Sequence, residues 1–255
     1  MDVQPIERAA TGIYGLDDLL EGGFPRGRTI LISGACGTGK SIFCTQFLVK
    51  GAIEQGEPGV LVSFDETPHK IRQDMLRFGW NLNALEQKGL FTILDATSAR
   101  AGAPSEEENA LLPGQLDMDK VLIDILTLCR RVGAKRLVID SIPAMGQQLE
   151  REGDIRKTIL KLSYILSRAG LTTLITSEIE EQSIGSGRSL TFSKYAVEEY
   201  VADGVLLLNF LGIGSSEVRT MYIRKMRGTK HSTNIHPMEI NEKGMTVHKI
   251  ENVFK

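Results

Sequence analysis

The chain has 255 residues, 42% of them hydrophobic and 24% charged, with a formal net charge of −2. This composition is that of an ordinary globular protein, and the length fits one α/β domain covering residues 1–255. The balance of 30 basic and 32 acidic residues gives no overall positive field for nonspecific nucleic-acid binding, although a local patch or an assembled ring could still bind.

Most of the chain alternates between predicted strands and predicted helices. Residues 28–33 form a short apolar run before a glycine-rich loop, and residues 42–54 have helical spacing. Further strands are predicted at residues 60–64, 90–95, 136–140 and 171–176, and further helices at residues 68–78, 119–133 and 155–170. Continuous apolar runs such as residues 60–64 are typical of strands buried on both faces. The alternation predicts a mainly parallel sheet flanked by helices.

Two regions depart from this alternation. Residues 97–118 are rich in glycine, proline and glutamate, and we expect them to form an insertion or a mobile loop. After about residue 203, apolar runs follow one another with only turns between them. These runs are residues 205–210, 219–225, 237–241 and 245–250. They predict an antiparallel or mixed extension of the sheet.

The most informative motif is Gly34-Ala35-Cys36-Gly37-Thr38-Gly39-Lys40-Ser41, which fits the pattern G-x-x-x-x-G-K-[ST]. Its three glycines allow backbone N–H groups to form an anion-binding nest. Lys40 supplies a cation for the β- and γ-phosphates, and Ser41 supplies a hydroxyl for Mg²⁺. The motif also lies between a predicted strand and a predicted helix, which is the context that this mechanism requires. The sequence therefore predicts binding of ATP and Mg²⁺.

Carboxylates follow two of the predicted strands. Asp140 ends the strand at residues 136–140 and is interpreted as metal-linked, although an aspartate there also fits a helix N-cap. Asp65 and Glu66 follow the strand at residues 60–64, at the edge where open α/β sheets hold ligands. Hydrolysis needs a group that orients or deprotonates the attacking water, and these two are the candidates. The alternative is an acidic approach to the next helix.

Several segments together resemble the KaiC family of RecA-type ATPases. They are Thr11-Gly12-Ile13-Tyr14-Gly15-Leu16-Asp17, Gly22-Gly23-Phe24-Pro25-Arg26-Gly27, the phosphate loop, Ser63-Phe64-Asp65-Glu66-Thr67-Pro68, Phe78-Gly79-Trp80, Ile139-Asp140-Ser141, Tyr195-Ala196-Val197-Glu198-Glu199-Tyr200 and Lys225-Met226-Arg227-Gly228-Thr229. The resemblance covers nearly the whole chain. It implies a RecA-like core and hexameric rings with ATP held between subunits.

The resemblance also implies roles for individual residues. The paired catalytic glutamates of the family fall on Asp65 and Glu66, so the first is here one methylene shorter, and Glu66 is the expected general base. Lys225 and Arg227 match residues that reach the γ-phosphate bound to a neighbouring subunit. Without the resemblance, these two would be read as a solvated charge pair on an edge strand.

The expected site therefore has three sets of residues. The catalytic set is Glu66, Asp65 and Lys40; the nucleotide-binding set is Gly34, Ala35, Cys36, Gly37, Thr38, Gly39, Lys40, Ser41, Phe78, Lys225, Arg227, Thr229 and His231; the metal set is Ser41 and Asp140. Phe78 is expected near the base of ATP. His231 either faces the nucleotide of the neighbouring subunit or is an exposed loop histidine.

The cysteines and the N-terminus indicate the compartment. Cys36, Cys44 and Cys129 are an odd number without metal-ligand spacing, and the first residues do not form a signal peptide. No apolar run approaches the roughly 18 residues that a membrane span needs. We therefore expect reduced thiols in a cytoplasmic protein without membrane contact. Cys36 reads as a small spacer in the phosphate loop, although its oxidation could block ATP.

The expected function is that of a ring-forming regulatory or signalling ATPase with an unidentified protein partner. One alternative is a DNA-repair accessory related to RecA and RadA, because residues 178–200 occupy the place of a DNA-facing loop. Acidic residues outnumber basic ones in that segment, which weakens the alternative. Beside Glu198-Glu199-Tyr200 no Ser-Thr pair stands in the register that autophosphorylation needs in the family. A second alternative is a non-catalytic assembly protein gated by ATP.

Overall fold

The computed structural model describes residues 5–114, 117–146, 152–179, 193–195, 198–213 and 216–250. Within these ranges one sheet contains β3 (Thr29–Gly34), β4 (Gly59–Ser63), β5 (Phe91–Asp95), β6 (Arg136–Asp140), β7 (Thr172–Glu178), β8 (Gly204–Ile213), β9 (Ser216–Met226), β10 (Ile235–Asn241) and β11 (Gly244–Val247). A separate pair joins β1 (Arg8–Ala9) to β2 (Phe24–Pro25).

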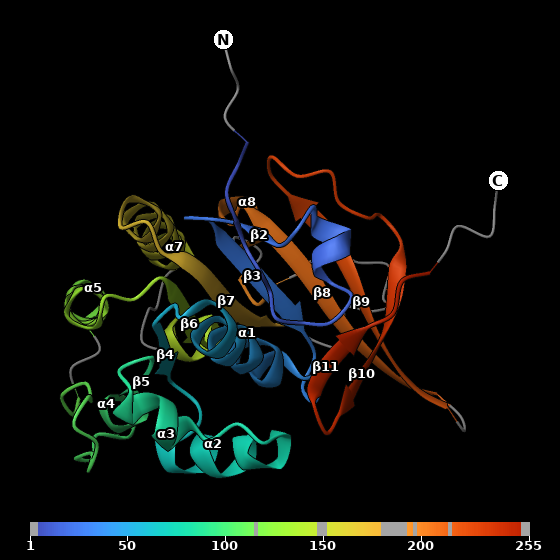
Figure 1. Ribbon diagram of the computed structural model, residues 1–255. Helices are drawn as coiled ribbons and strands as arrows, with labels where there is room; N and C mark the ends of the chain where they lie inside the picture. The colour runs from blue at the N-terminus through green and yellow to red at the C-terminus, as the bar shows by residue number, and fades with distance from the viewer. Residues whose placement is uncertain are drawn as a thin grey trace.

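The nine strands of the main sheet lie in the order β11-β10-β9-β8-β3-β7-β6-β4-β5. The six strands from β8 to β5 in this order pair in parallel. The strands β9, β10 and β11 pair antiparallel and form the right-hand side of the molecule in Figure 1. The prediction of a mainly parallel sheet with a C-terminal antiparallel extension is therefore confirmed.

Helices cover both faces of the parallel strands. The helices are α1 (Lys40–Gln55), α2 (Pro68–Met75), α3 (Leu82–Gln87), α4 (Thr97–Ala101), α5 (Met118–Val132), α6 (Ile142–Gly146), α7 (Glu152–Arg168) and α8 (Glu198–Val201), with short 3₁₀ turns η1 (Asp17–Leu20) and η2 (Leu76–Phe78). No helix in the described ranges has the length and apolar character to span a membrane.

Alternate residues of each strand feed two separate hydrophobic cores. On β3, Ile30 and Ile32 belong to the core under α1, whereas Leu31 belongs to the core under α5 and α7. This follows from the two-residue period of a strand and explains why the strand sequences are continuously apolar.

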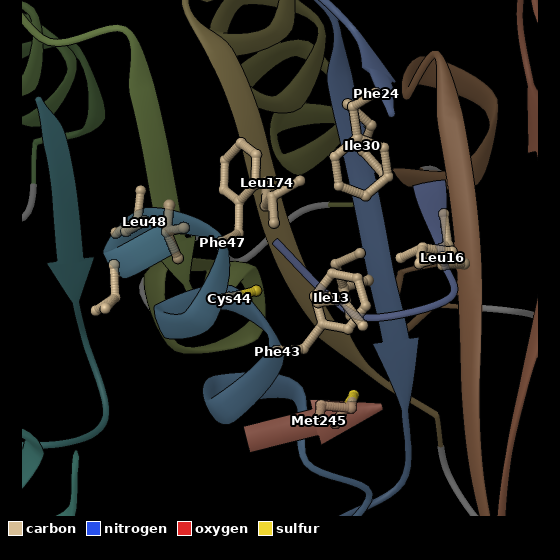
Figure 2. Packing of buried hydrophobic residues seen from close by; sticks show 14 of the residues in the cluster. Ile13, Leu16, Phe24, Ile30, Phe43, Cys44, Phe47, Leu48, Leu174 and Met245 are labelled. Carbon is tan, nitrogen blue, oxygen red and sulfur yellow. The ribbon is translucent and has the colours of Figure 1, made fainter. Parts of the chain in front are cut away.

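The helix α1 is anchored to the sheet by bulky side chains along one face. Phe43 and Phe47 are fully buried, and Figure 2 shows them directed from α1 into the cluster that Ile30 of β3 and Leu174 of β7 line. Met245 of β11 closes the same cluster near the start of the helix. Because this helix begins at the phosphate loop, its packing fixes the loop at the edge of the sheet.

The stretch at residues 97–118, where we expect an insertion or a mobile loop, contains the short helix α4 and, in its described part up to residue 114, no other named helix or strand. It begins with α4, and the chain beyond it pairs with the end of β5 through Asp95 N to Asn109 O and Leu111 N to Asp95 O, both 2.9 Å. Arg72 of α2 also donates to Glu107, with an Nη1–Oε1 distance of 2.6 Å. The polar composition thus serves specific side-chain contacts, which periodicity does not reveal.

Four short helices, α3, α4, α6 and α8, were not predicted from the sequence. The helix α3 begins after Asn81, whose side-chain oxygen accepts a hydrogen bond from Ala84 N at 3.1 Å. An asparagine just before apolar residues at helical spacing, here Leu82 and Leu85, is an N-cap signal, and the helix that follows has six residues.

A buried arginine connects several elements at the amino end of the parallel strands. Arg136 is fully buried, pairs with Glu57 at 2.7 Å (Nε–Oε2) and donates from Nη1 to Ala10 O at 2.8 Å and Phe47 O at 2.9 Å. A Cβ on Gly51 would lie 2.2 Å from the arginine Nε, so this position of α1 must stay without a side chain. The arginine thus joins β6, α1 and the N-terminal segment.

Replacing Arg136 by methionine is expected to lower the free energy of unfolding by about 3 kcal/mol. The substitution breaks a buried ion pair and leaves the carbonyls of Ala10 and Phe47 without their hydrogen-bond donor. Arg26 still pairs with Glu57 at 2.5 Å, which keeps the loss at the low end of the range. Urea denaturation measures the change. Lys50→Ala, which removes the exposed Lys50–Glu54 pair of α1, is the control and should cost less than about 0.5 kcal/mol. An equal effect of both variants would contradict this role of Arg136.

Candidate nucleotide-binding site

Four chain segments meet at the carboxyl edge of the parallel strands. The register pairs Gly34 with Glu178 and Ser63 with Asp140, so the ends of β3, β7, β4 and β6 lie side by side. A cavity of about 590 Å³ opens at this edge. It is lined by Cys36, Gly37, Gly39, Lys40, Ser41, Ile42, Asp65, Glu66, Asp74, Met75, Arg77, Phe78, Asp140, Ser141, Glu178, Arg219 and Ile240. The ligand edge inferred from the sequence is therefore a hollow.

The glycines of the phosphate loop serve two different purposes. Gly37 and Gly39 have φ values of 77° and 97°, conformations that L side chains rarely adopt, so here glycine is needed for the backbone itself. Gly34 does not have a positive φ. A Cβ there would lie 2.4 Å from Leu208 O on β8, so this glycine is needed for close approach of the two strands. The expectation that all three serve the loop conformation is corrected for Gly34.

Hydrogen bonds within the loop hold it in shape. Lys40 Nζ donates to Gly34 O and to Ala35 O, both at 2.9 Å, and Thr38 Oγ1 donates to Ala35 O at 2.9 Å. The ammonium therefore sits at the mouth of the loop, bound to carbonyl oxygens. Cys36 is exposed and lines the cavity, whereas Thr38 is fully buried. Nζ must turn from the carbonyls to contact a phosphate.

Ser41 and Asp140 form a pair suited to a divalent cation. Ser41 Oγ donates to Asp140 Oδ2 at 2.7 Å, and Thr176 Oγ1 donates to Asp140 Oδ1 at 2.5 Å. Burial raises the pKa of Asp140, and the two hydroxyl donors act against that rise. Mg²⁺ binds oxygen ligands and usually takes one or two protein groups beside water and phosphate. The donor set fits this ion: Ser41 would bind it, with Asp140 beside it.

The neighbouring carboxylates Asp65 and Glu66 are in different surroundings. Asp65 pairs with Arg100 at 2.5 Å (Oδ1–Nη1) and accepts from Ser141 Oγ at 2.6 Å. Glu66 is fixed through its backbone, whose carbonyl accepts from Ser63 Oγ at 2.6 Å. The carboxylate of Glu66 accepts no hydrogen bond from the described parts of the chain.

The pKa of Glu66 is raised by its position. Partial burial is the largest cause, and nearby carboxylates act in the same direction. In decreasing order of effect, those carboxylates belong to Asp140, Asp74 and Asp65. Lys70 opposes them. A carboxylate with a raised pKa is a better proton acceptor, which is what a general base requires.

The far side of the cavity carries residues that the sequence analysis missed. Phe78 lines it as expected and packs on Trp80 with ring centroids 4.8 Å apart. Arg219 and Ile240 come from β9 and β10, and no local motif marks either of them. The Arg219 guanidinium lies 4.2 Å from the centroid of the Phe210 ring, and its Nε is buried without a partner in the described structure.

Three further charged lining residues were also missed. They are Asp74, Arg77 and Glu178. Glu178 ends β7 and could have been found with the strand-end argument that identified Asp140. Asp74 lies on α2 and Arg77 on η2. Their place in the cavity can be inferred only once the packing of this segment beside the phosphate loop is known.

Comparison with known proteins identifies the family. The protein-family model described as the KaiC ATPase matches residues 9–252. The chain belongs to the KaiC ATPase family. Its core is thereby of the RecA type, as the resemblance implied.

Relatives of similar length and longer ones both match this KaiC-family chain. A UPF0273 protein of Aeropyrum pernix is 38% identical over 244 residues, covering 95% of this chain and 94% of the relative. The circadian clock oscillator protein KaiC of Synechococcus elongatus is 36% identical over 245 residues, covering 96% of this chain but 44% of that protein. The chain thus spans less than half of the clock protein. A solved KaiC-like protein from Pyrococcus horikoshii OT3 aligns with a TM-score of 0.81 at 38% identity, covering 96% of this chain and 100% of that one.

Lys225 and Arg227 lie far from the cavity of their own chain. Lys225 pairs with Val205 at the start of β8, whereas Leu208, three residues further along that strand, pairs with Gly34 at the phosphate loop. Three residues of strand span roughly 10 Å, and β9 is also separated from β3 by the whole of β8. Both cations are therefore near the amino edge of the parallel strands, out of reach of their own phosphate loop.

Local contacts hold these cations and their neighbours in place. Lys225 Nζ donates to Ala202 O at 2.6 Å, and Arg227 Nη1 lies 3.5 Å from Asp203 Oδ1. Thr229 Oγ1 accepts from an arginine of the N-terminal segment, Arg8, at 2.5 Å. His231 Nδ1 lies 2.9 Å from Ser232 O and borders a separate surface groove. None of the four predicted residues lines the cavity of its own chain.

Much of the segment at residues 178–200 lies outside the described residues. Among the residues compared with a DNA-facing loop, Gly185, Gly187 and Arg188 fall in that part, as do the hydroxyl residues Ser189 and Thr191. The structure therefore adds no observation in favour of the DNA hypothesis or of autophosphorylation.

Proposed function

We propose that this member of the KaiC family binds Mg·ATP in the cavity at the phosphate loop and hydrolyses it. The observation that carries the proposal is the 2.7 Å contact between Ser41 Oγ and Asp140 Oδ2, in a cavity that Lys40 and Glu66 also line. The cavity volume of about 590 Å³ falls within the range of small-molecule sites.

The residues take separate roles in this proposal. The loop N–H groups, the N-terminus of α1 and Lys40 hold the β- and γ-phosphates. Ser41 and Asp140 hold Mg²⁺, which neutralises charge developing on the phosphate oxygens. Glu66 removes a proton from the attacking water, or orients that water, and Phe78 lies near the base. The alternative of a non-catalytic, ATP-gated assembly protein does not explain why the carboxylate of Glu66 lies unpaired and partly buried in this cavity.

We further propose that the active unit is a ring, with a hexamer as the expected size and one ATPase domain per subunit. Lys225 and Arg227 lie too far from their own phosphate loop to assist it, so they serve the nucleotide of the next subunit. A head-to-tail contact of this kind closes into a ring when its rotation permits. Thr229 and His231, which follow these cations in sequence, are assigned to the same interface.

The biological role proposed is regulatory or signalling, through an unidentified protein partner that reads the nucleotide state. The proposed compartment is the cytoplasm, where the free cysteines Cys36, Cys44 and Cys129 stay reduced. Burial raises the pKa of the Cys44 and Cys129 thiols, which makes these two poorly reactive.

The test is ATP turnover by purified protein, measured as released phosphate with and without Mg²⁺. Turnover should be lost in Lys40→Ala, which removes the cation of the phosphate loop, and on chelation of Mg²⁺. Lys50→Ala, at a partly exposed position of the same helix outside the cavity lining, is the matched control and should retain it. Wild-type turnover no greater than that of Lys40→Ala would overturn the proposed activity.

A further inference from the structure

The carboxylate of Asp65 accepts hydrogen bonds from two different parts of the chain. Arg100 Nη1, on α4, lies 2.5 Å from Asp65 Oδ1, and Ser141 Oγ, just after β6, lies 2.6 Å from Asp65 Oδ2. The same arginine nitrogen donates to Phe64 O at 3.2 Å. Both carboxylate oxygens are therefore engaged. The contacts connect α4, the end of β4 and the residue that follows Asp140.

The element that carries Arg100 is itself fixed. The N–H of Thr97, at the start of α4, donates to Asp95 Oδ1 at 2.9 Å, and Ser98 Oγ donates to Leu111 O at 3.2 Å. Gly114 N donates to Ala99 O at 3.1 Å at the end of the segment. Arg100 thus extends from a short helix tied to β5 on one side and to the following segment on the other. It does not line the nucleotide cavity.

The carboxylates of Asp65 and of the adjacent Glu66 differ in their hydrogen bonding. Glu66 has its backbone fixed by Ser63 but its carboxylate free of hydrogen bonds to the described residues. Asp65 has one methylene fewer than a glutamate, so its carboxylate stays beside the strand end, within reach of Ser141. The two oxygens of the Asp65 carboxylate are occupied by a guanidinium and a hydroxyl, whereas the carboxylate of Glu66 is available to water.

We propose that Arg100 is a positioning residue for ATP hydrolysis, which holds Asp65 against Ser141 and so leaves Glu66 as the only carboxylate of the pair that acts on water. The proposal rests on the ATPase activity proposed above. Asp65 then works as a structural link between α4 and the Asp140 strand end. Loss of Arg100 releases Asp65, and both Glu66 and Ser141 lose a fixed neighbour.

The test compares kcat with the affinity for ATP. Arg100→Ala is expected to lower kcat roughly tenfold, the size of effect seen when a group that orients an active-site residue is removed. The Kd of ATP should stay within about threefold, because Arg100 lies outside the cavity lining. Arg100→Lys should recover part of the loss, since it keeps one cation beside Asp65.

A double-mutant cycle and a control separate this role from a general structural one. Arg100→Ala should add little to the loss already caused by Asp65→Asn, because both changes break the same link. Arg131→Ala, which removes a contact to Asn109 in the segment after α4, should leave kcat unchanged. Multiplicative effects of the Arg100 and Asp65 variants, or an equal loss in Arg131→Ala, would overturn the proposal. Unchanged kcat in Arg100→Ala overturns it while the ATPase stands; absent wild-type turnover overturns both.

Discussion

Replacing Glu66 by glutamine is expected to lower kcat for ATP hydrolysis by roughly 10²–10⁴-fold, the usual worth of a general base. The amide keeps the size of the side chain but cannot take a proton. Glu66 lines the cavity without holding the phosphate loop or the Ser41–Asp140 pair. Affinity for ATP should therefore persist, which equilibrium binding of a fluorescent ATP analogue measures beside phosphate release.

A second carboxylate on the cavity wall provides the control. Asp74→Asn should retain turnover, because Asp74 is assigned no part in activating water. Its charge does raise the pKa of Glu66. Removing that charge lowers this pKa, so the acidic limb of the kcat/KM profile should move to lower pH. Turnover of Glu66→Gln equal to wild type would show that another group activates the water, and Glu66 would lose its assignment.

The sequence was sufficient to predict the fold because its signals are local. The apolar runs that end at Gly34 and Asp140 identify the strands, and the glycine-rich loop after β3 identifies the edge that holds a ligand. Asp140 and Glu66 were found for the same reason, since each lies at or just after the end of a buried strand. Such features depend on a few neighbouring residues and can be read without the fold.

The rest of the site could not be predicted because its partners are far apart in the chain. Arg219 and Ile240 reach the cavity from the antiparallel extension, and only the pairing of β8 with β3 brings that extension to the phosphate loop. Arg100 meets Asp65 across 35 positions, from a stretch whose composition looked like that of a loop. Contacts of this kind follow from topology and have no local pattern.

The assignment of Lys225 and Arg227 to a neighbouring subunit predicts complementation between two inactive proteins. Replacing both cations by alanine should lower turnover by roughly 10³-fold, at the lower end for a cation that stabilises phosphoryl transfer in trans. Glu66→Gln is inactive for a different reason. In a mixed ring, an intact Glu66 of one subunit can face intact cations of the next, and random mixing at equal amounts makes about a quarter of the interfaces complete.

The experiment mixes the two variants without nucleotide, restores Mg·ATP, and follows phosphate release with the mass of the assembly. Recovery of turnover in the mixture, with each variant inactive alone, is the expected result. Arg28→Ala is the control, because Arg28 pairs with the same Asp203 at 3.0 Å yet is not assigned to the nucleotide. If mixed rings form but stay inactive, Glu66 and the two cations must act on the same nucleotide from within one subunit, and the assignment to the neighbouring subunit is wrong. The position of Lys225 and Arg227 at the amino edge of the sheet argues against that outcome, since neither can reach its own phosphate loop without breaking the β8–β9 pairing.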